Sequence, residues 1–121
     1  MAGLIVSATL AALFICAAPQ AVDGDTLRCR GLGLVRLLHI DAPELPGHCR
    51  PGRACTPGDG YASTAHLTRL IQHRPVRCAP TGRDTYGRIL ASCLAAGTDI
   101  SCAQVSSGHA IERYGHLICR D

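Results

Sequence analysis

Five short runs of mostly apolar residues, bounded by glycine, proline or aspartate, predict β-strands along the chain. They are residues 19–23, 26–30, 34–40, 76–79 and 88–94. The first two runs are separated by Asp-Gly-Asp, which is typical of a tight turn because Gly24 tolerates positive φ. We therefore expect the first two strands to fold back on each other as a hairpin.

The segment between the third and fourth predicted strands has helical spacing instead. Ser63, Leu67, Leu70 and Ile71 would share one face of a helix. Thr56-Pro-Gly-Asp is a helix start signal, with threonine as the N-cap and proline at the first helical position. The sequence thus predicts a helix that begins after Thr56 and ends at about residue 73, before a proline.

A second, shorter helix is predicted after the fifth strand, with Ser101 as its cap and Gly108 at its end. The tail from residue 110 shows no clear periodicity. Three strands, a helix, two strands and a short helix follow the element order of a mainly β protein built on a five-stranded OB-fold barrel. Barrels of this class bind oligonucleotides on one face.

The N-terminal segment from Leu4 to Ala18 is almost unbroken apolar sequence, shorter than a membrane span and close to a signal-peptide core. Cys16-Ala-Ala resembles a small-residue cleavage site. We expect residues 1–18 to be a signal peptide and residues 19–121 a single domain, with cleavage earlier, or none, as alternatives. The expected product is secreted or periplasmic, without stable membrane association after cleavage, and monomeric.

Eight cysteines in 121 residues also indicate an oxidising compartment. Cys49 and Cys55 lie in a loop rich in proline and glycine, where a disulfide would order the chain. The alternative is that this pair binds zinc together with His48, although zinc pairs usually have closer spacing. The other cysteines allow too many pairings for the sequence to decide.

All twelve basic residues are arginines, and the formal charge is +3. Composition bias alone explains this usage, but arginine also binds phosphate through two parallel hydrogen bonds, which lysine cannot do. The balance is compatible with a nucleic-acid partner without demonstrating one.

Acidic residues are concentrated in the segment from residue 22 to residue 44. Four of the nine acids in the chain lie there, close to Arg36: Asp23, Asp25, Asp41 and Glu44. The last two flank Pro43, which ends the third strand, so they lie where the chain leaves the sheet. Carboxylates gathered beside an arginine suit a bound cation and a phosphate better than a core.

Three dispersed motifs carry a resemblance. They are Val-Asp-Gly-Asp-Thr-Leu from residue 22, Val-Arg-Leu-Leu-His-Ile-Asp-Ala-Pro-Glu from residue 35, and Asp-Thr-Tyr-Gly-Arg-Ile-Leu-Ala from residue 84. In order and spacing they resemble the staphylococcal-nuclease-like, or thermonuclease, family over roughly residues 21–114. The resemblance implies a calcium-dependent endonuclease that cleaves DNA and RNA, preferably single-stranded, to leave 3′-phosphates.

The resemblance also implies a role for each motif residue. Two aspartates and a backbone carbonyl would bind Ca²⁺: Asp25, Asp41 and Ala42. Glu44 would act as the base that activates water, and Arg36 and Arg88 would hold the phosphate. Tyr86 and Tyr114 would contact the nucleotide. The chain departs from the family pattern at Thr85, where a lysine is usual, and at Ala42, where a threonine is usual.

Two other functions remain open at this point. A non-catalytic OB-fold module would bind nucleic acid without these acids, and a disulfide-rich extracellular interaction domain would need none of the motif residues. Each residue also has a simpler interpretation, such as turn formation for Asp23 and Asp25 or loop packing for Tyr86. The combination of acids and arginines at these spacings favours the nuclease.

Overall fold

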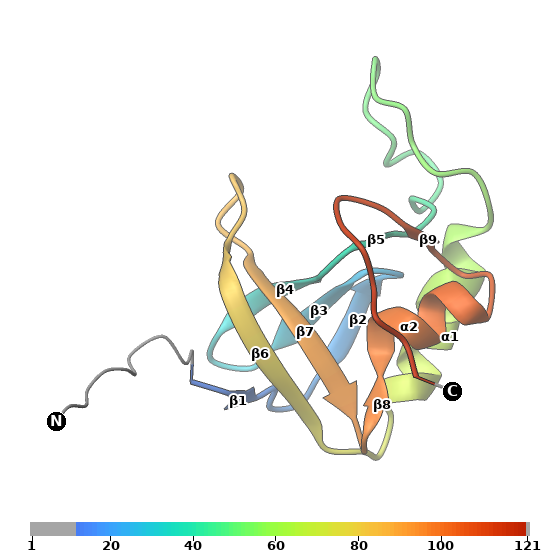
Figure 1. The fold of residues 1–121 in the computed structure, drawn as a ribbon. Coiled ribbons are helices and arrows are strands. Elements are labelled where there is room, and N and C mark those ends of the chain that lie inside the picture. Colours follow the sequence, from blue (N-terminus) through green and yellow to red (C-terminus); the bar gives the residue numbers. More distant parts are fainter. Residues whose placement is uncertain (1–11, 121) are drawn as a thin grey trace, which may run out of the picture.

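Strands from both halves of the chain form one curled sheet in the computed structural model, which describes residues 12–120 (Figure 1). The hydrogen-bonded order is β1-β6-β7-β4-β3-β2, with β8 paired to β7. These strands are β1 (Phe14–Ile15), β2 (Gln20–Asp23), β3 (Thr26–Cys29), β4 (Gly33–Leu37), β6 (Val76–Arg83), β7 (Ile89–Ala95) and β8 (Thr98–Asp99). A separate two-stranded sheet pairs β5 (Ile40–Asp41) with β9 (Ile111–Glu112).

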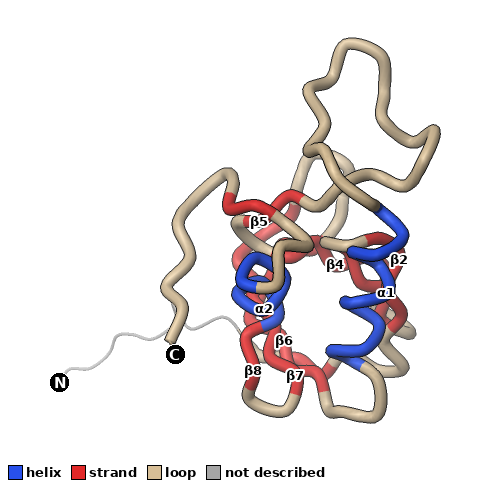
Figure 2. The backbone as a smooth tube through the Cα atoms, turned by 90° about the vertical axis from the view of Figure 1, so that its right-hand side faces the viewer, coloured by secondary structure: helices blue, strands red, loops and turns tan. Residues whose placement is uncertain are grey.

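The five expected strands correspond to β2, β3, β4, β6 and β7. Among the described strands only β4 and β7 pair in parallel, and this pair joins the first three strands to the last two. The predicted mainly β fold of OB type is therefore confirmed, as a sheet that curls into a half-barrel (Figures 1 and 2). The expected third strand divides into β4 and β5 because His39 adopts φ 66° between them.

Both helices have N-caps other than the predicted ones, so α1 begins later than the sequence suggests and α2 begins earlier. Helix α1 spans Gly60–Ile71, and its N-cap is Asp59, whose side chain accepts a hydrogen bond from the amide of Ala62 (3.1 Å). The predicted cap Thr56 is wrong, because its hydroxyl donates to Asp41 instead (2.6 Å). Helix α2 spans Ile100–Ser106, and its cap is Asp99 rather than Ser101.

The core lies between the concave face of the sheet and the two helices. Leu27 and Val35 of the sheet, Leu67 of α1 and Ile100 of α2 are fully buried there. Burying each such side chain stabilises the folded state by ~1.5–3 kcal/mol. Because the chain has few aromatic residues, these aliphatic side chains supply most of the hydrophobic stabilisation. Helix α1 packs most closely on β2 and so covers the turn that carries the first acidic motif.

Four disulfides join all eight cysteines: Cys16–Cys29, Cys49–Cys55, Cys78–Cys93 and Cys102–Cys119. The predicted Cys49–Cys55 bond is confirmed, and the zinc alternative for this pair is wrong. Cys102–Cys119 ties the C-terminal tail to α2, and β9 gives that tail a strand that its sequence did not indicate.

The predicted signal peptide overlaps the folded part of the chain. Its first eleven residues lie outside the described part, whereas β1 pairs with β6 and Cys16 is buried in its bond with Cys29. Cleavage after Ala18 stays a prediction, and it would remove β1 and leave Cys29 without its partner. Within residues 12–120 no helix has the length and apolar character that crossing a bilayer requires.

Candidate active site

A cleft of about 510 Å³ is lined by residues from the tip of the β6–β7 hairpin, from β4 and β5, and from the long loop before α1. Seven of the eight predicted site residues line it: Asp25, Arg36, Asp41, Glu44, Tyr86, Arg88 and Tyr114. The eighth, Ala42, lies beside the cleft and binds Asp25 through its amide. The three motifs, far apart in sequence, thus meet in one place.

The turn between β2 and β3 positions the first acids. The amide of Asp25 donates to the Oδ1 atom of Asp23 (3.0 Å), which closes the turn. Gln104 of α2, fully buried, donates through Nε2 to the carbonyl of Gly24 (2.7 Å). A side chain at position 24 would collide with Ser63 of α1, so glycine is required there for close approach to the helix. The sequence analysis expected Gly24 to adopt positive φ, but it does not. Glycine is needed there for the close contact with α1 instead.

Asp25 is bound on both carboxylate oxygens. Oδ1 accepts from the hydroxyl of Thr26 (3.0 Å), and Oδ2 accepts from the amide of Ala42 (2.8 Å). Burial raises the pKa of Asp25 to about 6 against the lowering effect of Arg36, and the neighbouring charge of Asp23 raises it further. The carboxylate is therefore short of positive charge, which is the condition under which a site gains from binding a cation.

Arg36 crosslinks the two aspartates from beneath the cleft. Its Nη1 donates to the carbonyls of Leu37 (3.0 Å) and Ile40 (2.9 Å), which the turn at residue 39 directs back toward it. Its Nη2 lies 3.2 Å from Asp41 and 3.3 Å from Asp25. Arg36 is only 8% exposed and its terminal nitrogens bind protein oxygens, so it balances the charge of the two carboxylates. Its contact with a phosphate stays a prediction.

Asp41 is fully buried and surrounded by cationic groups. Its Oδ1 contacts Arg36 and, at 3.5 Å, Arg53. Its Oδ2 accepts from the hydroxyl of Thr56 and contacts Arg113 at 3.3 Å. These contacts come from β4, from the loop before α1 and from the segment after β9, so the position of this carboxylate depends on the tertiary structure.

Glu44 is more accessible to solvent than the two predicted calcium ligands, Asp25 and Asp41. Its side chain is 22% exposed and lies 3.9 Å from Arg53. Its backbone is fixed by α1, because a side chain at Gly60 would collide with the carbonyl of Glu44. A carboxylate on a rigid segment with access to solvent can accept a proton from water.

The β6–β7 hairpin presents Arg88 from the opposite side. The Oδ1 atom of Asp84 accepts from the amides of Tyr86 and Arg88 (both 2.9 Å), and Oδ2 accepts from Nε of Arg88 (2.7 Å). Although burial raises the pKa of Asp84, these hydrogen bonds outweigh it and lower the pKa below its usual value. Asp84 thereby orients the guanidinium and leaves its two terminal nitrogens for a ligand.

Tyr86 and Tyr114 are both exposed at the rim. The guanidinium carbons of Arg50 and Arg88 lie 5.4 and 5.5 Å from the ring centre of Tyr86, and that of Arg113 lies 5.2 Å from the ring of Tyr114. Exposed rings with cations beside them suit stacked bases and their phosphates.

Sequence reasoning missed several polar residues that complete the site: Arg50, Arg53, Thr56, Asp84, Gln104 and Arg113. One signal was available, because Cys-Arg-Pro-Gly-Arg-Ala-Cys places two arginines inside the loop that the predicted disulfide closes. Among the described residues, no three histidine, cysteine, aspartate or glutamate side chains converge closely enough to hold a metal ion by themselves.

Comparison of the sequence with known proteins identifies a family. The sequence model described as staphylococcal nuclease homologue matches residues 34–117, more than half of the chain. The chain is 35% identical over 96 residues to "Succinoglycan biosynthesis protein ExoI" of Rhizobium meliloti, covering 78% of this chain and 50% of that protein. It is 33% identical over 107 residues to an "Uncharacterized endonuclease" of Haemophilus influenzae, covering 84% of this chain and 54% of that protein.

A shorter match, 43% identical over 58 residues, is to "Probable endonuclease LCL3" of Verticillium alfalfae, covering 48% of this chain and 19% of that protein. The chain thus spans about half the length, or less, of these relatives. The family match covers the second and third motifs and the segment between them, where most of the cleft residues lie. The chain belongs to the staphylococcal nuclease homologue family.

Proposed function

We propose that this protein is a calcium-dependent endonuclease that hydrolyses phosphodiester bonds in DNA and RNA. The observation that carries the proposal is that six predicted site residues from three separate motifs line one cleft together with Tyr114. Family membership and the names of two endonuclease relatives support the same reaction class. Residues that only stabilise the fold would not need to bring buried carboxylates, hydrogen-bonded arginines and exposed tyrosines together at one site.

The donor set fits a hard divalent cation. Calcium takes six to eight oxygen ligands, including carboxylates, backbone carbonyls and water. The side chains of Asp25 and Asp41 lie within 3.3 Å of the same Arg36 nitrogen, and the Ala42 carbonyl follows directly in the chain. Because two carboxylates and one carbonyl leave most of the shell to water, we expect weak binding, near ~10⁻⁴–10⁻³ M. Bound calcium would supply positive charge to the phosphate oxygens.

Each protein side chain has a separate role in the hydrolysis. Glu44 accepts a proton from a water molecule, whose oxygen forms a new bond to phosphorus. The bond from phosphorus to the 5′ oxygen breaks, and that oxygen takes up a proton, which leaves a 3′-phosphate and a 5′-hydroxyl. Arg88 donates its terminal nitrogens to the phosphate as charge develops, while Arg36 keeps the aspartates balanced beneath it.

The substrate we expect is single-stranded. Tyr86 and Tyr114 are each 68% exposed, and exposed aromatic rings suit stacking with unpaired bases better than contact with a closed duplex. Four disulfides support a secreted or periplasmic location, where such bonds persist.

Digestion of a labelled single-stranded DNA by the purified, oxidised protein tests the proposal. We expect cleavage with millimolar calcium, none with a chelator, recovery on adding calcium back, and 3′-phosphate ends by mass spectrometry. Binding without cleavage under every condition would instead identify a non-catalytic OB-fold module.

A further inference from the structure

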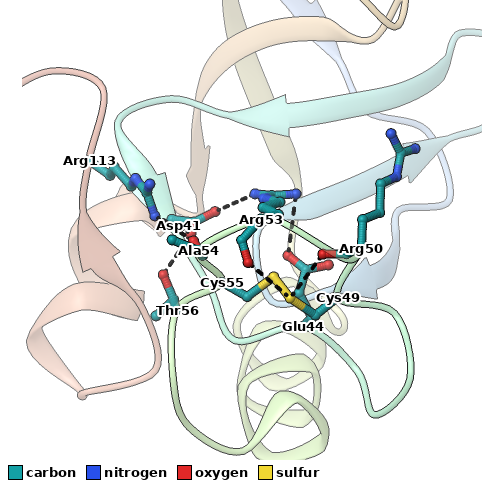
Figure 3. Close-up of a disulfide and its surroundings, with 9 residues drawn as sticks. All are labelled: Asp41, Glu44, Cys49, Arg50, Arg53, Ala54, Cys55, Thr56 and Arg113. Atoms are coloured by element: carbon teal, nitrogen blue, oxygen red, sulfur yellow. Dashed lines mark hydrogen bonds and ion pairs between the residues drawn. A yellow bond between two sulfur atoms is a disulfide. The ribbon is translucent and has the colours of Figure 1, made fainter.

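The loop closed by the Cys49–Cys55 disulfide places a guanidinium among the acids of the cleft. Arg53, on this loop, lies with Nη2 3.5 Å from Asp41 and Nη1 3.9 Å from Glu44 (Figure 3). It thus spans one proposed calcium ligand and the proposed base. Arg53 lies outside the three motifs that the sequence analysis identified.

The contacts of Arg53 differ from those of Arg36. Both distances exceed the 2.7–3.2 Å typical of N–H···O hydrogen bonds, and the Arg53 side chain is 42% exposed. Arg36, in contrast, is buried and its terminal nitrogens donate at 2.9–3.2 Å. Arg53 is therefore held near the acids by charge while retaining N–H donors for another anion.

The position of Arg53 follows from the order of its loop. The amide of Arg53 donates to the carbonyl of Arg50 (3.1 Å), which makes a turn inside the disulfide ring. Immediately after the ring, Thr56 is hydrogen-bonded to Asp41. The ring is thereby anchored to the cleft at its exit, and the disulfide limits the positions that Arg53 can reach.

We propose that Arg53 is a further phosphate-binding arginine, in addition to Arg88, and that the Cys49–Cys55 ring holds it over the reacting phosphate. The proposal rests on the nuclease function proposed above. A water molecule activated by Glu44 must attack phosphorus, so the phosphate lies next to Glu44 and hence next to Arg53. The planar guanidinium then exchanges its long contacts with the carboxylates for shorter, paired hydrogen bonds to phosphate oxygens.

In this arrangement Arg53 has opposite effects on the two ligands: it weakens calcium binding and strengthens phosphate binding. Before substrate binds, its positive charge beside Asp41 opposes a calcium ion at the same carboxylate. When substrate is present, that charge attracts the phosphate. A residue that only supported the loop would change both affinities in the same direction, or neither.

Arg53→Gln tests the proposal by two binding measurements that need no turnover. Chelator competition should show calcium binding about 3- to 10-fold tighter than wild type, since a nearby cation is removed. Fluorescence anisotropy with a single-stranded oligonucleotide, in a Glu44→Gln background with calcium, should show binding about 10- to 100-fold weaker. The slope of log affinity against log salt should fall by about 0.7, the contribution of one phosphate contact.

Matched variants separate this role from charge and folding in general. Arg77→Gln removes an exposed arginine of β6 outside the cleft and should leave both affinities close to wild type. Arg53→Lys should keep the salt slope but lose most of the gain from paired hydrogen bonds. Cys49→Ser with Cys55→Ser should weaken oligonucleotide binding to a similar degree, and adding Arg53→Gln should then cost little more.

Unchanged oligonucleotide affinity and salt slope in Arg53→Gln would overturn the proposal, whether or not the wild-type protein cleaves. A fall in both calcium and oligonucleotide affinity, with a lower melting temperature, would assign Arg53 to loop structure and also overturn it. Failure of the proposed function is recognised separately, by the absence of cleavage in wild type with calcium.

Discussion

The amide of Ala42 donates a 2.8 Å hydrogen bond to the Oδ2 atom of Asp25, which lies 17 positions earlier in the chain. The bond joins the turn after β2 to the segment that leaves β5. Arg36 strengthens the connection, because it contacts both Asp25 and Asp41. The two proposed calcium ligands are therefore held together by protein contacts, so less ordering is needed when an ion binds.

Asp25→Asn should weaken calcium binding at least ~10-fold while leaving the fold intact, because an amide oxygen still accepts from Ala42 but carries no charge. Without calcium the melting temperature should be equal to or above wild type, since burying a neutral amide costs less than burying a carboxylate. Asp25→Ala provides the contrast: it leaves the Ala42 amide unsatisfied and should lower the melting temperature. Calcium titration and thermal unfolding measure both effects, and an equal loss of stability in both variants would contradict this account.

Glu44→Gln should reduce turnover of bound substrate by ~10²–10⁴, the usual contribution of a base that assists water, while oligonucleotide affinity persists. Single-turnover cleavage and anisotropy separate these quantities. Glu112→Gln makes the same chemical change outside the cleft and should retain activity. If Glu44→Gln lost affinity but kept its turnover, Glu44 would be a structural residue.

Arg88→Lys keeps the charge but loses Nε, the atom that Asp84 binds, and the planar group that can hold two phosphate oxygens. We expect kcat to fall by ~10²–10³, as for removal of an oxyanion donor, with a much smaller change in substrate affinity. Arg77→Lys on β6 is the matched control. A rate near wild type would show that Arg88 acts only as a surface charge.

His109 makes part of the stability pH-dependent. Burial, together with the stacked ring of His66 (4.5 Å between ring centres) and the charge of Arg69, lowers the pKa of His109, although Asp59 opposes this. The unfolded chain then binds a proton at this residue more readily than the folded protein does. The contribution of neutral His109 to the stability is therefore fully present above the ordinary histidine pKa of about 6.5, and it is lost as the pH falls through the lower pKa of the folded state.

His109→Gln should reduce the drop in melting temperature between about pH 7.5 and pH 5.5, whereas His116→Gln, at an exposed position, should leave it unchanged. Identical pH profiles for wild type and His109→Gln would show that this ring does not limit acid stability.

The motif residues were predictable from the sequence because their chemistry is local. Two acids around one glycine, an arginine in the third predicted strand and an acid after a proline can be recognised at short range, and the family resemblance then implies a role for each. The Cys49–Cys55 bond was predictable for the same reason, since a ring of this size in a loop rich in proline and glycine can close with little help from the fold. Thr56 shows where prediction from local sequence fails. Its neighbours in the sequence indicate a helix cap, but in the fold its hydroxyl donates to the buried Asp41 instead.

The sequence by itself therefore determined the fold class, one disulfide, and a set of candidate residues that the fold brings to one cleft, including three acids and two arginines (Asp25, Asp41, Glu44, Arg36 and Arg88). Only the tertiary structure decided which groups balance those acids. Asp41 is surrounded by side chains from three segments: Arg36 on β4, Arg53 and Thr56 in the loop before α1, and Arg113 after β9. A buried charge must be compensated by whatever polar groups the packed chain brings within a few ångströms. That distance is a property of the folded sheet and loop, and no local pattern encodes it.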